Sequence, residues 1–430
     1  MDLTQPNVFV AGAYSKRSAF QPLEDNPEAN AIDAAAGVIE PWLSSLLQSE
    51  HLALLVGNGL TRAVASALEV DAASMNEVDF AGRNAERVKA FAKKTAETCG
   101  RGEPNIEDQL RAAQSLIEGY RVVYEENEEP LKQWLEEYQG ALTKLMKDVL
   151  ATEERVGRKL AEGGEFDKTG LLGFLLAFAS RPRPRERLEV FTTNYDRLIE
   201  HACDMLGIRI LDRFVGTLQP AFRSSRVQVD LHYDPPGIRG EPRYLEGVLR
   251  LTKLHGSLDW RLANNLVVRE ALPFGASEAH PGIPVDSYKT VMIYPNAAKD
   301  VETLSYPYAD LFRDFAASLC RPNTTLFVYG YSFGDDHINR VIKDMLTLPS
   351  THLVIIARSD TGERLSRFVS GVNNQNQLTV LKGKHFADLK QLAMRYIPHA
   401  SLPVRRPEDT TPAAIAAGGV GGAGAAGTVA

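Results

Sequence analysis

Four segments of the chain combine glycine with polar side chains directly after apolar, strand-like runs. The first is VGNGLT at residues 56–61. Two glycines let the backbone turn sharply, and a helix that starts there would offer unpaired N–H groups to a pyrophosphate. The candidate phosphate-binding residues are Gly57, Asn58, Gly59 and Thr61. A plain tight turn would give the same pattern, because the third glycine of G-x-G-x-x-G falls on Arg62.

The second segment is TTNYD at residues 192–196, at the end of another apolar run. In open α/β sheets, ligands bind at the carboxyl ends of strands. The amide of Asn194 could orient a water or a sugar hydroxyl, and Asp196 adds a carboxylate to the same loop. Helix capping is the competing interpretation, because Asn and Asp favour helix N-termini and a helix is expected over 197–206.

The third segment is KLHGS at residues 253–257. A single histidine is usually a structural residue, and eight others are present. His255 stands at a strand end and precedes Gly256, which would leave its ring facing a cleft. Imidazole is the side chain best suited to proton transfer near neutral pH, so His255 is a candidate catalytic residue.

The fourth segment is GYSFGDD at residues 330–336, again after an apolar run. Gly330 and Ser332 would bring backbone and hydroxyl groups to a helix entrance, where phosphate or ribose could bind, with Asp336 beside them. The same residues match G-x-S-x-G, the nucleophile elbow of α/β hydrolases. That alternative needs an acid and then a histidine later in the chain, and Asp360 and His385 are in the required order.

The elements that would position these segments follow from apolar, β-branched runs at 52–56, 188–192, 290–294, 325–329, 353–357 and 378–381. Stretches with helical spacing lie between most of the runs. This alternation predicts an α/β fold, a Rossmann-like parallel sheet with helices on both faces. The first two runs are far apart, and the interval carries apolar residues at helical spacing, which predicts a large helical insertion between the first two strands.

The expected organisation has four parts. Residues 1–50 form an irregular arm and a helix near 30–48, and residues 51–71 with 186–400 form the sheet domain. Residues 72–185 form the helical insertion. The Ala/Gly-rich stretch 401–430 lacks large apolar side chains and is expected to be a disordered tail.

Composition narrows the class of protein. A formal charge of −7 disfavours a dedicated nucleic-acid or anionic-membrane surface. The three cysteines form no C-x-x-C pair, so neither a zinc ribbon nor a disulfide framework is expected. Residues 1–20 show no signal peptide, and no long apolar stretch could span a membrane. We therefore expect a cytoplasmic protein that holds no metal and does not bind nucleic acid directly.

In order and placement, the four segments resemble motifs of the sirtuin (silent information regulator) superfamily. The family's G-A-G-x-S loop looks like residues 57–61, and its T-x-N-x-D segment looks like 192–196. Its catalytic H-G looks like His255-Gly256, and its G-x-S nucleotide loop looks like 330–332. The resemblance covers roughly 50–70 and 186–395, and it implies a sheet domain that binds NAD.

The departures from sirtuin deacylases narrow the resemblance. The D-F-R that follows the first glycine loop is replaced by TRAVA at 61–65, and the four-cysteine zinc module is missing. The F-G-E segment is also missing, and MIYPN at 292–296 stands near its place. What remains is similar to the bacterial sirtuin-like NADases of antiphage defence. These proteins carry large helical insertions and often form homo-oligomers, and some pair with a HerA-type ATPase.

This resemblance implies hydrolysis of NAD, as substrate, to nicotinamide and ADP-ribose. Asn194 would position the water or the ribose, and His255 would be the general base or a ribose contact. Asp196 would meet the nicotinamide carboxamide, while Ser332 and Asp336 would touch phosphate or the adenosine ribose. Protein deacylation and ADP-ribosyl transfer are alternatives with the same cofactor chemistry. A non-catalytic nucleotide sensor or scaffold is an alternative from another class.

Overall fold

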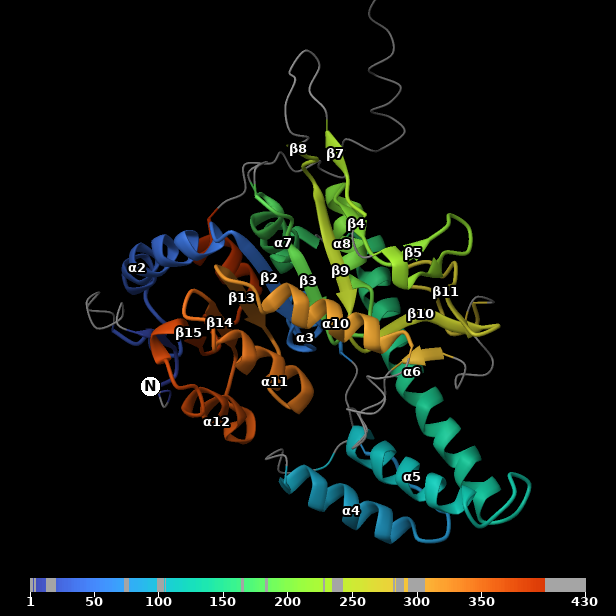
Figure 1. Ribbon diagram of the computed structural model, residues 1–430. Helices are drawn as coiled ribbons and strands as arrows, with labels where there is room; N and C mark the ends of the chain where they lie inside the picture. Colours follow the sequence, from blue (N-terminus) through green and yellow to red (C-terminus); the bar gives the residue numbers. More distant parts are fainter. Residues whose placement is uncertain are drawn as a thin grey trace, which may run out of the picture.

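The computed structural model describes residues 3, 5–12, 21–72, 77–98, 104, 106–163, 166–181, 185–226, 229–233, 243–280, 283, 290–292 and 306–398. Its centre is an eight-stranded sheet (Figure 1). In spatial order the strands are β1 (Val8–Ala11), β15 (Leu378–Lys382), β14 (His352–Ala357), β13 (Thr324–Tyr329), β2 (His51–Val56), β3 (Glu189–Thr192), β9 (Val248–Lys253) and β4 (Arg209–Leu211). All neighbours pair in parallel except β1 with β15.

Helices cover both faces of this sheet, because alternate residues of each central strand point to opposite sides. In β2, Leu54 belongs to the core on one face and Leu55 to the core on the other, and both are fully buried. The first core is covered by α2 (Ala29–Leu47), α3 (Gly59–Ala67), α7 (Leu171–Ala179) and α8 (Leu198–Leu206). The second is covered by α10 (Tyr308–Leu319), α11 (Asp336–Met345) and α12 (Arg364–Ser370). The predicted α/β, Rossmann-like fold is confirmed.

A helical insertion lies between β2 and β3, the first two parallel strands. It contains α4 (Ala85–Thr98), α5 (Ile106–Arg121) and the 31-residue α6 (Leu131–Ala161). Figure 1 shows α4 and α5 standing away from the sheet, joined to it by α6. These helices bury a small core of their own around Trp134, whose indole N–H donates to Arg83 O at 2.8 Å. The apolar helix α7 lies inside the bounds 72–185 predicted for the insertion, but it packs into the sheet core.

Two features differ from the sequence-based expectation. The arm before α2 is not wholly irregular, because β1 adds an antiparallel strand at the sheet edge. The run expected at 290–294 forms β12 (Thr290–Met292), which does not belong to the parallel sheet. It joins an antiparallel sheet with β10 (Gly256–Ala263), β11 (Leu266–Arg269), β6 (Ala221–Phe222) and β5 (Phe214–Val215). Short apolar runs look alike in either kind of sheet, so periodicity could not separate them.

The order of the strands determines where a ligand can bind. From β2 the chain moves to β3 and β9 on one side, and later to β13, β14 and β15 on the other. Such a reversal leaves a crevice outside the carboxyl ends of the central strands, where ligands bind in open α/β sheets. Strands β2, β3, β9, β13 and β14 all end at this edge. The tail predicted for 401–430 lies outside the described residues.

Candidate functional site

A pocket of about 700 Å³ lies at the carboxyl edge of the parallel strands. Its lining includes the candidate residues Gly57, Asn58, Gly59, Thr61, Asn194, Asp196, His255, Gly330 and Ser332. Among the predicted residues only Asp336 is not part of the lining; it is exposed at the first position of α11. The preceding residue, Asp335, lines the pocket instead. The fold thus brings together four segments that are far apart in sequence.

The floor of the pocket is made by two glycine turns in direct backbone contact. Gly57 N–H donates to Tyr329 O at 3.0 Å, and Gly59 N–H donates to Gly330 O at 2.9 Å. A Cβ atom on Gly59 would lie 2.4 Å from Gly330 Cα. Gly330 itself has a φ of +64°, which favours glycine. These glycines are therefore needed for the two loops to meet.

The expected phosphate donors divide into two pairs. The N–H groups of Gly57 and Gly59 are already bonded across the two loops. Those of Asn58 and Thr61 donate to no backbone carbonyl of the described residues, and they stand at the start of α3. Unpaired N–H groups at a helix N-terminus attract anions, so Asn58 and Thr61 are the better placed donors for a phosphate.

The side chain of Asn194 is held in one orientation by its neighbours. Its Nδ2 donates to Gly57 O and to Thr61 Oγ1, each at 3.1 Å. Because a carbonyl oxygen can only accept, the amide nitrogen must face Gly57. Asn194 Oδ1 is left buried at the pocket wall without a hydrogen-bond partner among the described residues. An unpaired buried acceptor is costly, and a ligand hydroxyl or a water that donates to it would satisfy it.

Asp196 performs the capping role that was the competing interpretation of this segment. Its Oδ1 accepts from Leu198 N–H, at the start of α8, at 3.2 Å, and its Oδ2 accepts from the Thr61 hydroxyl at 2.6 Å. Thr61 Oγ1 in turn accepts a hydrogen bond from Asn194 Nδ2. The Asp196 carboxylate therefore fixes the Thr61–Asn194 pair, and it also lines the pocket.

His255 occupies the tight turn between β9 and β10, with only 4% of its surface exposed. Its ring centroid lies 6.5 Å from that of Tyr195 and 5.8 Å from that of His337. The turn is tied to the Asn194 loop, because Leu258 N–H donates to Tyr195 O at 3.0 Å. The proximity of His337, on α11, was missed from the sequence because it depends on how that helix packs.

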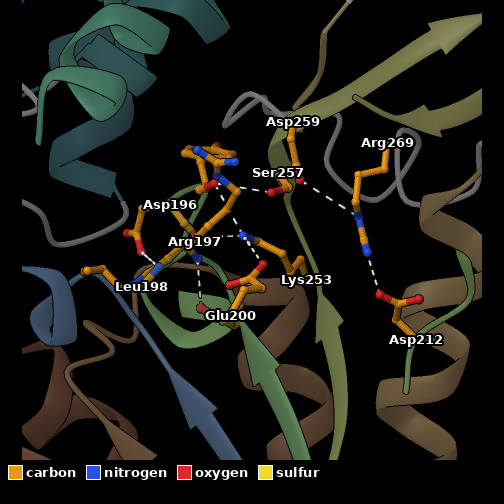
Figure 2. A network of polar contacts seen from close by, with 12 residues as sticks. Asp196, Arg197, Leu198, Glu200, Asp212, Lys253, Ser257, Asp259 and Arg269 are labelled. Carbon is orange, nitrogen blue, oxygen red and sulfur yellow. Dashed lines mark hydrogen bonds and ion pairs between the residues drawn. The ribbon is translucent and has the colours of Figure 1, made fainter. Parts of the chain in front are cut away.

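A buried polar network holds the loop that contains Asn194 (Figure 2). The ammonium of Lys253 donates to Asp196 O at 2.6 Å and pairs with Glu200 at 3.0 Å. Figure 2 also shows Arg269, on β11, between Asp259 and Asp212. These ion pairs join β11 to β10, the strand that follows His255, and to the segment after β4. The peptide groups beside Asn194 are thus held by charge-assisted bonds.

The helical insertion supplies one wall of the pocket through α6. Val149 and Thr152 line the cavity, and the next residue, Glu153, is fully buried. Glu153 Oε1 accepts from the backbone N–H of Arg197, and Glu153 Oε2 pairs with the guanidinium, both at 2.6 Å. Burial raises the pKa of Glu153 to about 7, and the charge of Arg197 opposes this rise. The pair fixes α6 to the residue that follows Asp196.

Sequence reasoning also missed a polar group after β14. Arg358, Ser359, Thr361 and Arg364 line the pocket. The signal was present, because Arg358 directly follows an apolar run that ends at the same sheet edge as the other segments. The run predicts a strand, and the strand-end argument applies equally to the residues after it.

The α/β-hydrolase alternative is not supported by the contacts of its required residues. Ser332 Oγ accepts from Arg364 Nη1 at 3.5 Å. Both carboxylate oxygens of Asp360 accept backbone N–H groups at the start of α12. His385 Nε2 is hydrogen-bonded to Tyr396 at 2.7 Å. Since serine, acid and histidine each bond elsewhere, they form no catalytic triad.

Three further observations describe the chain and its candidate site. Within the described part of the chain, no group of three or more His, Cys, Asp or Glu side chains could hold a metal ion. In that same part, no helix is both long and apolar enough to cross a bilayer. Cys203 is buried, and burial raises the pKa of its thiol, which agrees with a packing role.

Comparison with known proteins finds a similarity in the region that carries most of the pocket. Residues 188–379 match the family model of the SIR2-like domain. The match runs from just before β3 into β15 and includes Asn194, His255 and Ser332, while the glycine turn after β2 lies outside it. No curated protein matches the chain significantly. SIR2-like domains bind NAD and are typically NAD-dependent enzyme domains.

Proposed function

We propose that this chain, which carries a SIR2-like domain, is an NAD hydrolase that releases nicotinamide and ADP-ribose. The observation that carries the proposal is the orientation of Asn194. Its amide nitrogen donates to Gly57 and Thr61, so its oxygen is left buried and without a partner among the described residues, in the wall of the pocket that His255 also lines. An acceptor and an imidazole in one pocket suit the positioning and deprotonation of a water.

The reaction makes limited demands on the protein. Breaking the nicotinamide–ribose bond gives an oxocarbenium-like sugar, as in glycoside hydrolysis. Nicotinamide is cationic in NAD and takes the bonding electron pair, so it leaves as a neutral molecule without an acid. Water then adds to C1′ and loses a proton. The site must therefore hold the substrate, orient the ribose and receive one proton.

Each role has a candidate residue. Asn58 and Thr61 N–H groups would bind the pyrophosphate above the glycine floor, and Asn194 Oδ1 would accept from the water or the ribose. His255 would receive the proton. Asp196, which already holds Thr61, remains the proposed contact of the nicotinamide carboxamide. Ser332 would touch phosphate or ribose, and Asp335 takes the place expected for Asp336.

The test is to incubate the purified chain with NAD and measure nicotinamide and ADP-ribose by chromatography. Asn194→Ala and His255→Ala should each lower turnover about 100-fold or more, because each removes a positioned group. Asn264→Gly changes an exposed hairpin turn with positive φ and should leave turnover unchanged. Binding of NAD without turnover by the wild type would support the sensor alternative, and near-normal turnover by either folded pocket variant would disprove its role.

The biological setting proposed from the resemblance is antiphage defence, in which NAD is depleted when infection is sensed. An unrestrained hydrolase would drain the cofactor of its own cell, so activity is expected to be low until a partner or signal arrives. A homo-oligomer and a HerA-type ATPase partner are part of this proposal. Turnover by the isolated chain that is already fast, and unchanged by such an ATPase, would contradict it.

A further inference from the structure

The pocket contains a βαβ unit of the kind that binds the adenosine half of dinucleotides. Strands β13 and β14 are parallel neighbours, and the turn Gly330-x-Ser332-x-Gly334 joins β13 to α11. In such units, the residue at the end of the second strand meets the ribose next to adenine. An acidic residue there accepts from the ribose 2′-hydroxyl, whereas an arginine accommodates a 2′-phosphate. At this position the chain has Arg358.

Arg358 is free to bind a ligand. Its side chain is exposed and lines the pocket, and it makes no hydrogen bond or ion pair with a described residue. Ser359 and Thr361 add hydroxyl groups to the same rim, 3.3 Å from each other. The guanidinium of Arg364 is close by and donates to Thr361 O at 3.1 Å. This rim therefore offers several donors to an anion.

The only acidic residue in the segment 358–362 is already engaged. Asp360 Oδ1 accepts from Leu365 N–H at 2.8 Å, and its Oδ2 accepts from Ser366 N–H at 3.1 Å. The carboxylate thus caps α12 and is turned to the helix. Asp335 also lines the pocket with a carboxylate, but it follows β13 and not β14.

The distance across the sheet suits a dinucleotide. Our proposed function puts the reacting end of the substrate at Asn194, after β3. Strand β14 lies three strands away, beyond β2 and β13. At about 4.8 Å per strand this is roughly 14 Å. A dinucleotide whose pyrophosphate lies over the β2–β13 floor would therefore bring its second ribose to Arg358.

We infer that the pocket selects a nicotinamide dinucleotide that carries a 2′-phosphate on the adenosine ribose, NADP in preference to NAD, with Arg358 as the phosphate contact. This inference rests on the proposed function for the direction in which the substrate lies. It goes beyond that function because it names the form of the dinucleotide.

The kinetic test compares kcat/KM for NADP and for NAD. The wild type should favour NADP by about tenfold or more, as expected for a charge-assisted contact. Arg358→Ala should lower kcat/KM for NADP by a similar factor and leave NAD nearly unchanged. Arg367→Ala, an exposed arginine of α12 outside the pocket lining, should change neither. Preference of the wild type for NAD, or equal losses for both substrates in Arg358→Ala, would overturn the inference.

A binding measurement separates this inference from the proposed function. Adenosine 2′,5′-bisphosphate and AMP both lack nicotinamide and differ only in the 2′-phosphate, so their affinities by calorimetry do not depend on turnover. The wild type should bind the bisphosphate about tenfold more tightly than AMP, and Arg358→Ala should bind the two ligands with equal affinity. If this selectivity is found without hydrolysis of either dinucleotide, the proposed function fails and the inference stands. If NAD is hydrolysed and AMP binds as well as the bisphosphate, the inference fails alone.

Discussion

The chemistry of the pocket depends on which atom of a side chain is left for a ligand. Hydrogen-bond donors and acceptors in the neighbouring residues fix this choice. Asn194 could present either end of its amide, but Gly57 O requires the nitrogen. The asparagine that motif reasoning selected thus offers an acceptor, not a donor, to a ligand. In the same way, the glycines expected to bind phosphate use their own N–H groups to join two loops. The N–H groups of Asn58 and Thr61 donate to no backbone carbonyl of the described residues, so they can donate to a ligand.

Gly330→Ala is expected to disrupt the pocket floor. The new Cβ would lie 2.6 Å from Gly59 Cα, and alanine is strained at a φ of +64°. We expect the free energy of unfolding to fall by about 2 kcal/mol or more, together with loss of dinucleotide binding. The measurement is urea unfolding followed by calorimetric titration.

Gly140→Ala is the matched control for this substitution. Gly140 is an exposed residue inside α6, and nothing lies within 4 Å of an added Cβ. Alanine should raise the free energy of unfolding there by about 0.5–1 kcal/mol. A Gly330→Ala protein as stable as the wild type would show that the two loops are not held in backbone contact.

The residues that sequence reasoning identified share one property. Asn194, His255 and the paired glycines follow apolar runs and precede turns, so their position at the sheet edge could be predicted from the chain alone. His337 and Asp335 could not be identified in this way, because their placement depends on which side of α11 faces the sheet. Arg358 was predictable by the strand-end argument but was not singled out.

At the scale of elements, the insertion and the sheet are joined through the buried pair Glu153–Arg197. Arg197 Nη2 also donates to Pro273 O at 3.1 Å, so one side chain links α6, the loop before α8 and the segment after β11. The sequence predicted the insertion because its helices have regular apolar spacing. It did not predict this junction, nor the short strands of the antiparallel sheet, because both depend on contacts between distant residues.

Glu153→Ala should be strongly destabilising, because it leaves the charge of Arg197 buried without its partner. We expect a loss of about 3–5 kcal/mol in the free energy of unfolding. Glu154→Ala removes a neighbouring glutamate whose partner, Arg158, is largely exposed, and it should cost less than about 0.5 kcal/mol. Denaturant unfolding of both variants tests the difference.

If Glu153→Ala fails to fold, the double variant Glu153→Met/Arg197→Met keeps the prediction testable. Methionines at both positions remove the two charges together, so this protein should fold and be more stable than the single variant. Equal destabilisation by Glu153→Ala and Glu154→Ala would mean that the pair does not hold the insertion in place.

The contact of α2 with the sheet should make stability depend on pH. Trp42 Nε1 donates to Thr379 Oγ1 at 2.9 Å, and that hydroxyl is 2.8 Å from His352 Nε2. The Thr379 hydroxyl can donate to His352 only while the imidazole is neutral. Burial lowers the pKa of His352 to about 4.

The sign of this effect follows from the lowered pKa. An unfolded histidine titrates near pH 6.5, so the stabilisation is complete above that value and is lost as the pH falls towards 4. At pH 5 the loss is about 2 kcal/mol. His352→Gln cannot titrate, and its unfolding free energy should therefore change less between pH 7.5 and 5. Identical pH dependence in both proteins would contradict the assignment.

For the whole molecule, the surface of the insertion bears on assembly. Val122 is 86% exposed and Val123 is 70% exposed, directly after α5, and Phe91 on α4 is half exposed. Exposed apolar side chains on helices that stand away from the sheet suit contacts between subunits. They are where we place the interface of the proposed homo-oligomer.

Light scattering after size exclusion should find a mass that is a multiple of 47.3 kDa. The double variant Val122→Asp/Val123→Asp should lower this mass while keeping the helical circular dichroism of the wild type. A single species of 47.3 kDa at about 10 µM wild type would refute the assembly. An unchanged mass in the variant would place the interface elsewhere than at the end of α5.

The long helix α6 connects the pocket wall to the outer helices. Glu153 fixes it beside the pocket, Leu142 belongs to the same buried cluster as Tyr195, and about 16 Å of helix separates Leu142 from Leu131 at the far end. A rotation of about 5° at Leu142 would displace the far end by roughly 1.5 Å, whereas the pocket wall at Thr152 would scarcely move. A change of angle there would thus be larger at α4 and α5 than at the pocket. A fluorophore or spin label placed there would report on ligand binding more sensitively than one beside the site.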